Sequence, residues 1–286
     1  MTGLVRITLL GTGSSGGVPR ANGDWGDCNP SNPRNRRRRC SALVERAETR
    51  SDLDGGEAVT RVVIDTSPDF REQMLSARVT RIDGVVLTHD HADQTHGIDD
   101  LRAFAYLQRQ RIPVWMDAPT AATLVSRFGY TFDTPPGSSY PAILDRREMP
   151  DFGEPVTIDG PGGEVSLIPV DQEHGSIRSL GFRIGDIAYS PDINALPEAS
   201  VPLLDGVGCW IVDALRREPH PTHFTVDDAL AALERVGARF GVLTNMHITL
   251  DYDVLVDTLP EHVWPGYDGM RLIWDGERVR FDDLPE

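Results

Sequence analysis

The chain has 286 residues, 40% of them hydrophobic and 25% charged, so it is long enough to bury one sizeable hydrophobic core. Its formal net charge of −16 argues against general binding to nucleic acid or to anionic membranes, and an anionic substrate would need a local positive site. Lys and Arg together number 28 and all of them are Arg, which excludes mechanisms that use a catalytic lysine.

We expect a single domain over residues 1–286, because no repeat, low-complexity tract or linker marks a boundary. The three cysteines are too few and too scattered for a disulfide framework. There is no signal-peptide pattern and no apolar stretch of about 20 residues. We therefore expect a cytoplasmic protein with no membrane partner.

Short apolar or β-branched runs recur along the chain and predict a strand-rich protein. The expected strands are Leu4–Leu10, Ser41–Val44, Arg61–Asp65, Gly84–Thr88, Pro113–Met116, Glu164–Pro169, Leu180–Ile184, Ile187–Ser190, Cys209–Val212, Phe240–Thr244 and Arg271–Trp274. Fewer segments show helical periodicity. The expected helices are Phe70–Ser76, Asp99–Gln110, Pro119–Phe128, Val226–Val236 and Tyr252–Leu259. Thr225 with Asp228 predicts a capped helix start, and Asp275-Gly276 predicts a hairpin turn.

The first expected strand runs into a glycine-rich segment, Gly11–Gly17, which matches the pattern G-x-G-x-x-G. This pattern indicates dinucleotide binding only when a helix follows the glycines. Prolines, further glycines and an arginine run follow here instead. We therefore interpret the segment as a loop without a dinucleotide.

The strongest chemical signal is the segment His89–His96, which follows the apolar run Gly84–Leu87 and the single residue Thr88. It holds three histidines and two aspartates in eight residues. At the end of a buried strand these side chains gather at one edge of a sheet, which is unfavourable unless something binds them. Imidazole and carboxylate are ligands for zinc, manganese and iron, so the segment predicts a metal site.

Three further candidate ligands lie downstream: His174, Asp192 and His247. Each follows an apolar run of the β type. Strand ends are where a sheet protein brings residues from distant parts of the chain to one site. The sequence therefore predicts a metal centre assembled from strand ends.

The order H-x-H-x-D, then His, Asp and His, resembles the metallo-β-lactamase-fold hydrolases. The segments Leu9–Pro19, Ile64–Phe70 and Tyr267–Met270 are similar to the branch that contains the phosphodiesterase associated with carbon–phosphorus lyase operons. The resemblance spans the chain from Leu9 to Met270. It implies an α/β fold, an αββα sandwich of two packed mixed β-sheets flanked by helices.

The resemblance also implies two divalent metal ions, zinc or manganese. The family's ligands of the first ion match His89, His91 and His174. Its ligands of the second ion match Asp93 and His247, and the ligand that bridges the two ions matches Asp192. The family has a further histidine ligand of the second ion where this sequence has Gln94. An amide oxygen is a weaker zinc ligand than imidazole, so Gln94 should weaken the second site. One possibility is that His96 replaces the missing histidine as a ligand of the second ion. The other is that His96 lies at the surface or only supports the ligands.

The segment Glu218–Thr225 contains two histidines just before the capped helix. In the resembled family a histidine before this helix is the general acid. This implies His223 as the catalytic residue, with His220 as the alternative. The other interpretation is that the loop is exposed and has no catalytic role.

A run of arginines is the strongest positive feature of this acidic chain. Five guanidinium groups lie within six residues, at Arg34 and Arg36–Arg39. They could bind a phosphate group, or they could pair with the protein's own carboxylates. We expect at most one or two of them at the site.

These patterns together predict a metal-dependent hydrolase. The most specific form is a phosphodiesterase that uses a metal-activated hydroxide on a small phosphodiester, cyclic ones included. The alternatives are a lactone or thioester hydrolase of the same fold, since a fold does not fix the substrate, and a non-hydrolytic accessory protein that resembles the family member of quinone-cofactor biosynthesis. The expected partner is a small anionic phosphoester rather than nucleic acid, and a homodimer is compatible with the sequence.

Overall fold

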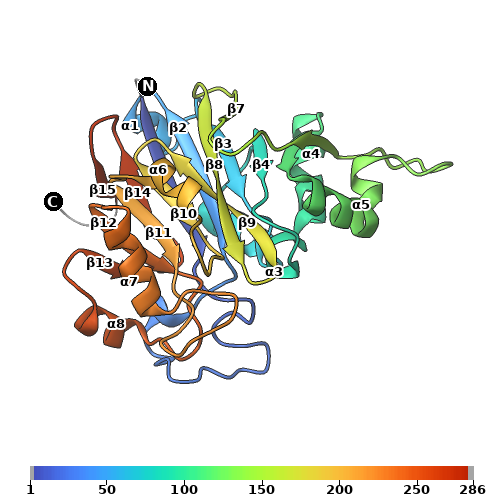
Figure 1. The fold of residues 1–286 in the computed structure, drawn as a ribbon. Coiled ribbons are helices and arrows are strands. Elements are labelled where there is room, and N and C mark those ends of the chain that lie inside the picture. Colours follow the sequence, from blue (N-terminus) through green and yellow to red (C-terminus); the bar gives the residue numbers. More distant parts are fainter. Residues whose placement is uncertain (1–2, 283–286) are drawn as a thin grey trace.

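The computed structural model describes residues 3–282. Two β-sheets pack face to face, and helices cover the outer face of each sheet (Figure 1). Alternate residues of a strand point to opposite faces of its sheet, so each sheet can bury one face against the other sheet and one against helices. The αββα sandwich expected from the sequence is confirmed.

The first sheet has eight strands in the order β15-β14-β1-β2-β3-β4-β5-β6. They span β1 Leu4–Gly11, β2 Ser41–Ala47, β3 Thr60–Ile64, β4 Gly84–Val86, β5 Ile112–Met116, β6 Leu144–Glu148, β14 Arg271–Trp274 and β15 Val279–Phe281. Strands β3 to β6 are parallel, whereas β1 and β2 pair antiparallel with their neighbours. The sheet is therefore mixed.

The second sheet has seven strands in the order β13-β12-β11-β10-β9-β8-β7. They span β7 Val156–Ile158, β8 Val165–His174, β9 Ile177–Ile184, β10 Ile187–Ser190, β11 Cys209–Asp213, β12 Phe240–Thr244 and β13 Val263–Pro265. Strands β10 to β13 are parallel and β7 to β10 are antiparallel. This sheet is mixed as well.

The longer helices lie on the outer faces of the sheets. Those that pack on the first sheet are α2 Phe70–Ala77, α4 Arg102–Gln108 and α5 Ala118–Phe132. Those that pack on the second are α7 Val226–Arg235 and α8 Tyr252–Thr258. The short helices are α1 Arg50–Leu53, α3 Ala92–Thr95 and α6 Val201–Leu204, with 3-10 turns at Pro33–Asn35, Ile98–Leu101 and Glu198–Ser200.

Two of the expected local signals are found in the structure. Thr225 and Asp228 form a capping box at the start of α7. Strands β14 and β15 form the hairpin expected around Asp275-Gly276. Three strands were not expected, namely β6, β7 and β13, and all three lie toward the sheet edges.

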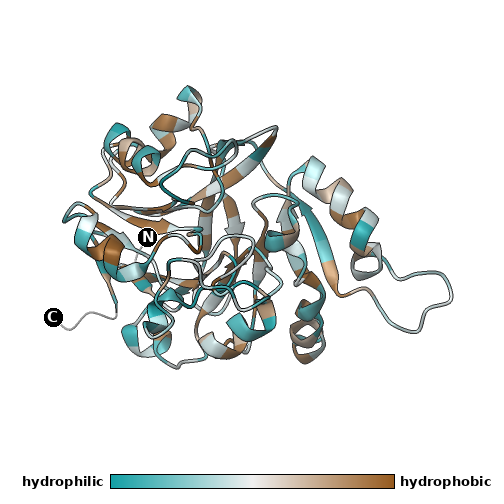
Figure 2. Cartoon of the chain, turned by 90° about the horizontal axis from the view of Figure 1, so that it is seen from below, coloured by the Kyte–Doolittle hydropathy of each residue, from teal (hydrophilic) through white to brown (hydrophobic). Residues whose placement is uncertain are grey.

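Strand periodicity separates the hydrophobic cores. Ala42 and Val44 of β2 lie in the core between the sheets, whereas Leu43 lies in the core under α2, α4 and α5. On the second sheet, Ile211 lies between the sheets and Trp210 packs under the helices. In Figure 2 hydrophobic colours run along the inner strands, and the loop after α5 is largely hydrophilic.

The ends of the parallel strands position the site. Strand β4 of the first sheet and strands β10, β11 and β12 of the second end at one edge of the sandwich, where the carboxyl ends of parallel strands gather. The loop between β1 and β2 lies next to this edge, and its Asn29 and Asn35 contact Asp251 at the start of α8. Among residues 3–282, no helix has the length and apolar character needed to cross a membrane.

Candidate active site

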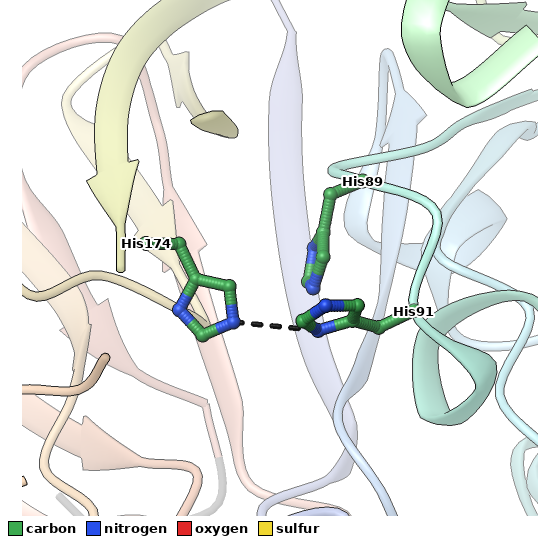
Figure 3. A group of neighbouring side chains, drawn as sticks. All are labelled: His89, His91 and His174. Carbon is green, nitrogen blue, oxygen red and sulfur yellow. Dashed lines mark hydrogen bonds between the residues drawn. The ribbon is translucent and has the colours of Figure 1, made fainter. Parts of the chain in front are cut away.

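Three imidazoles meet at this edge (Figure 3). His89 lies just beyond β4, His91 precedes α3, and His174 is the last residue of β8. Their ring centroids lie 4.5 to 5.1 Å apart, and His174 Nε2 lies 3.4 Å from His91 Nδ1. Zinc–nitrogen bonds of about 2.0–2.1 Å in a tetrahedral site place ligand nitrogens about 3.4 Å apart, so the spacing suits three ligands of one ion.

Hydrogen bonds determine which nitrogen of His89 faces the cluster. Thr88 Oγ1 donates to Asp65 Oδ2 at 2.9 Å and lies 3.0 Å from His89 Nδ1. The hydroxyl hydrogen is already used, so His89 Nδ1–H donates to Thr88 and Nε2 carries a lone pair. His89 Nε2 is buried and has no hydrogen-bond partner among the described residues. A metal ion would satisfy this lone pair.

The neighbouring loop orients His174 in the same way. His174 Nδ1 lies 2.6 Å from the carbonyl oxygen of Thr222. A carbonyl only accepts, so Nδ1–H donates and Nε2 keeps its lone pair for the cluster. Gly175 allows this approach, because a Cβ there would lie 2.4 Å from Thr222 Cγ2 and the backbone has a left-handed φ of 64°.

Burial keeps two of these rings neutral. Burial and the adjacent imidazoles hold the pKa of His89 well below its usual value. Burial and the positive charge of His223 lower the pKa of His174 to about 4. Neutral imidazole is the form that binds metal ions. The donor set of His89, His91 and His174 therefore fits one divalent ion.

Next to the imidazoles lies Asp192, which follows β10 and is buried. Its Oδ2 accepts from Gln94 Nε2 at 3.0 Å, and its Oδ1 accepts from Asn245 Nδ2 at 3.3 Å. Gln94 Nε2 also donates to Asp93 Oδ2 at 3.3 Å. Burial raises the pKa of Asp192 well above its usual value. The structure thus brings the predicted ligands Asp93, Gln94 and Asp192 together and joins them through amide hydrogens.

His223 reaches the cluster from the loop between β11 and α7. Its ring centroid lies 4.7 Å from that of His174, and its Nδ1 lies 2.7 Å from Asp213 Oδ2. Burial alone would lower the pKa of His223, but the carboxylates of Asp213 and Asp192 outweigh it and raise this pKa to about 9. His223 is therefore an imidazolium at neutral pH, with Nε2–H left to act as a proton donor.

Two residues of this network were not predicted. Asp213 is the last residue of β11, and Asn245 directly follows β12. Asn245 Nδ2 donates to Asp213 Oδ1 at 3.2 Å, and Asp213 is fully buried. Both are polar residues at the end of an expected apolar strand, the same signal that identified Asp192, so the sequence could have revealed them.

His247 is the predicted ligand that the structure does not bring to the imidazole cluster. Its Nε2 lies 2.6 Å from Arg20 Nη2 and its Nδ1 lies 3.1 Å from Thr249 Oγ1. The backbone after β12 explains this difference, because Asn245 has a left-handed φ of 58° and turns the chain there. As a result Asn245, and not His247, contacts Asp192.

The remaining two candidate histidines are His96, considered as a further ligand, and His220, considered as an alternative general acid. The ring of His96 packs edge-on against Phe128 with centroids 5.4 Å apart, and His96 is exposed. His96 therefore lies away from the imidazole cluster. The ring of His220 lies 5.1 Å from that of His223, and its Nδ1 lies 3.2 Å from Thr222 Oγ1.

Most of the arginine run contacts the protein itself. Arg34 lies over the rings of Tyr252 and Tyr267, and Arg37 is buried beside Cys28. The ion pairs of the next two arginines are Arg38 with Asp268 and Arg39 with Asp69. These contacts favour the interpretation that the run stabilises its loop.

Positive charge does reach the site from other residues. After burial, the charges of Arg20 and Arg216 are the main causes that lower the pKa of His247. Arg216 and His223 act on His220 in the same way. We call Arg20, Arg216, His220 and His247 the basic rim. Because the pKa values of His220 and His247 are lowered, the guanidinium groups of Arg20 and Arg216 carry the positive charge of this rim.

Comparison with known proteins agrees with the fold described above. Residues 60–248 match the family described as the beta-lactamase superfamily domain. A solved structure described as a new diphosphatase from the PhnP family is 31% identical, with a TM-score of 0.81 over 95% of this chain and 97% of that chain. Zn²⁺-bound PqqB from Methylobacterium extorquens is 19% identical, with a TM-score of 0.65 over 93% of this chain and 99% of that chain, and shares the fold.

A curated relative from Porphyromonas gingivalis (strain ATCC BAA-308 / W83) is named octanoyltransferase. It is 29% identical over 283 residues, which are 98% of this chain and 54% of that protein. The chain thus spans about half the length of this curated relative.

Proposed function

Because this chain belongs to the β-lactamase superfamily and has the metallo-β-lactamase fold near the PhnP branch, we propose that it is a metal-dependent phosphodiesterase acting on a small phosphodiester. The hydrolase neighbours and the His/Asp cluster support a metal-dependent hydrolase. The observation that carries the more specific proposal is the charged pair of His223 and Asp213 beside the imidazole cluster.

The three imidazoles would hold the ion. His89 is oriented through Thr88 and Asp65, and His174 through Thr222. Such hydrogen bonds fix the ring and its tautomer. A divalent ion bound there would activate water at neutral pH and polarise a phosphoryl oxygen.

His223 supplies the proton for the leaving group. Hydrolysis forms a phosphorus–oxygen bond to water and breaks the bond to the leaving alkoxide, which needs a proton. His223 Nε2–H donates this proton, and the proton released by the attacking water restores the imidazolium. Asp213 orients the ring through Nδ1 and stabilises its charge.

The charge around the site favours a small anion. His223, Arg20 and Arg216 place positive charge at or near the cluster, and a phosphodiester carries one negative charge that they would attract. A neutral lactone or thioester would not be attracted by this charge before it reacts. The net charge of −16 would repel a long polyanion, so nucleic acid is not the proposed substrate. The diphosphatase named among the solved structures also acts on a phosphorus–oxygen bond.

The remaining alternatives are an acyl-ester hydrolase, lactones and thioesters included, and an accessory protein without hydrolytic activity. The octanoyl group in the name of the P. gingivalis relative favours the former, and the shared fold of PqqB favours the latter. The proposed location is the cytoplasm.

A substrate panel tests the proposal. The protein, stripped of metal and reloaded with zinc or manganese, is assayed on bis(p-nitrophenyl) phosphate, a cyclic phosphodiester, a lactone and a thioester. His89→Ala, which removes one imidazole of the cluster, is the control for contaminating activity. Hydrolysis of the diesters by the reloaded protein and not by the control supports the proposal. Activity confined to the lactone or thioester favours the acyl-ester alternative, and no activity favours the accessory one.

A further inference from the structure

Two buried amide groups lie between three carboxylates beside the imidazole cluster. Gln94 Nε2 donates to Asp93 Oδ2 at 3.3 Å and to Asp192 Oδ2 at 3.0 Å. Asn245 Nδ2 donates to Asp192 Oδ1 at 3.3 Å and to Asp213 Oδ1 at 3.2 Å. Each amide therefore uses both of its hydrogens on two different carboxylates. We call Gln94 and Asn245 the amide pair.

The carboxylates determine the orientation of each amide. If the Gln94 side chain were reversed, its carbonyl oxygen would face Asp93 Oδ2 and Asp192 Oδ2 across the 3.3 and 3.0 Å that its nitrogen now spans, so three acceptor oxygens would meet. With the nitrogen toward the carboxylates, Gln94 Oε1 is left buried without a partner among the described residues. Leaving one neutral acceptor unpaired costs less than setting it against the carboxyl groups of the buried Asp192 and the half-buried Asp93.

The third carboxylate, that of Asp213, also contacts the charged ring of His223. Asp213 accepts from His223 Nδ1 at 2.7 Å and from the backbone N–H of Ile193 at 3.1 Å. The carboxylates of Asp192 and Asp213 are thus compensated by amide hydrogens, a backbone N–H and one imidazolium. Such compensation is what buried carboxylates require in the absence of a cation.

A second metal ion does not fit this arrangement beside the first. Candidate ligand atoms of His174, Asp192 and His223 also lie within 4.8 Å of one another, but His174 already belongs to the first site and His223 Nδ1 contacts Asp213. The ligands of a second ion would need free lone pairs, and an amide NH₂ group offers none. The imidazoles expected from the resemblance are missing, because Gln94 stands where the family has histidine and His247 contacts Arg20. The expectation of two ions therefore disagrees with the geometry.

We propose that this protein binds one divalent ion, at His89, His91 and His174, and that the hydrogens of the amide pair occupy the place of a second ion. His89 Nε2 of the first site keeps its lone pair, whereas Asp93, Asp192 and Asp213 each accept a hydrogen from the amide pair. This inference concerns metal number and does not depend on which ester the protein hydrolyses.

The test is the number of tightly bound ions. Stripped protein is incubated with excess zinc, desalted and analysed for metal per chain, and calorimetric titration gives the affinities. Wild type should bind one ion tightly. The double variant Gln94→His with Asn245→His should bind two, because it exchanges both amides for imidazoles. Gln110→His adds a histidine at an exposed position just beyond the end of α4 and should bind one ion like wild type.

Two equivalents in wild type, with affinities within about tenfold of each other, would overturn the proposal. So would a folded double variant, checked by far-UV circular dichroism, that still binds one ion. A second measurement covers a double variant that fails to fold: Gln94→Met keeps the side-chain length but removes the donor. Its metal-free form should melt several degrees below metal-free wild type. An unchanged melting temperature would show that the amide does not stabilise the carboxylates.

Discussion

Replacing His223 tests the proposed proton transfer. A positioned general acid contributes about 10²–10⁴-fold to the rate, or about 2.7–5.4 kcal/mol at 1.36 kcal/mol per factor of ten. The ring is held at 2.7 Å by the fully buried Asp213, so its Nε2 is the one nitrogen free to donate. We expect His223→Ala to lower kcat/KM for an alkyl phosphodiester by about 10³-fold.

The same variant also affects stability, and a second substitution separates the two effects. His223→Ala leaves Asp213 with donors from Ile193 and Asn245 alone, which should cost about 1–3 kcal/mol of unfolding free energy. In His223→Asn the amide can still donate to Asp213 but cannot transfer a proton. We expect His223→Asn to lose activity as His223→Ala does and to retain most of the stability, measured by urea denaturation.

The assay compares leaving groups. A p-nitrophenolate leaves without a proton, so both variants should lose less than about tenfold on bis(p-nitrophenyl) phosphate. His220→Ala, in the same loop, is the matched control and should retain most of its activity on both substrates. Equal losses on the alkyl and the p-nitrophenyl diester would refute proton donation by His223. Loss of bound metal in His223→Asn would show instead that His223 is a ligand.

Three further outcomes follow from the contacts. Thr88→Val removes the hydroxyl between Asp65 and His89 and should weaken zinc binding about 10–100-fold in a chelator competition; unchanged affinity would mean that this hydrogen bond does not orient His89. Arg20→Ala at the basic rim should raise KM for an anionic diester about 2–5-fold at low salt, with the difference shrinking at 1 M salt; a salt-independent effect would contradict an electrostatic role. Phe182→Ala, fully buried between the sheets, should cost about 3–5 kcal/mol in urea denaturation, and a loss below 1 kcal/mol would contradict the described packing.

The central strands could be predicted because burial leaves a clear pattern in the sequence. Segments such as Cys209–Val212 and Phe240–Thr244 are apolar because both of their faces are covered. Strand β6 has the sequence Leu-Asp-Arg-Arg-Glu and is largely exposed at the sheet edge, so it lacks that pattern. Strands β7 and β13 have three residues each, too few to show periodicity.

The candidate site could be predicted where a candidate ligand ends its strand or closely follows it. His89 and Asp192 follow β4 and β10 closely, and His174 ends β8, so the strand direction places them. His247 lies beyond the left-handed turn at Asn245, and a turn of this kind is not visible in residue spacing. The direction in which the Gln94 amide points depends on Asp192, 98 residues away, so local sequence could not reveal it.

The most direct test of the account is a metal titration with two readouts. Stripped protein receives increasing zinc or manganese, and bound metal and hydrolysis of bis(p-nitrophenyl) phosphate are measured on the same samples. The account predicts that diester hydrolysis is absent in the stripped protein, rises in proportion to bound metal and reaches its plateau at about one equivalent. Diester hydrolysis that is absent at every metal content would contradict the proposed phosphodiesterase, and a plateau only at two equivalents would contradict the one-ion centre.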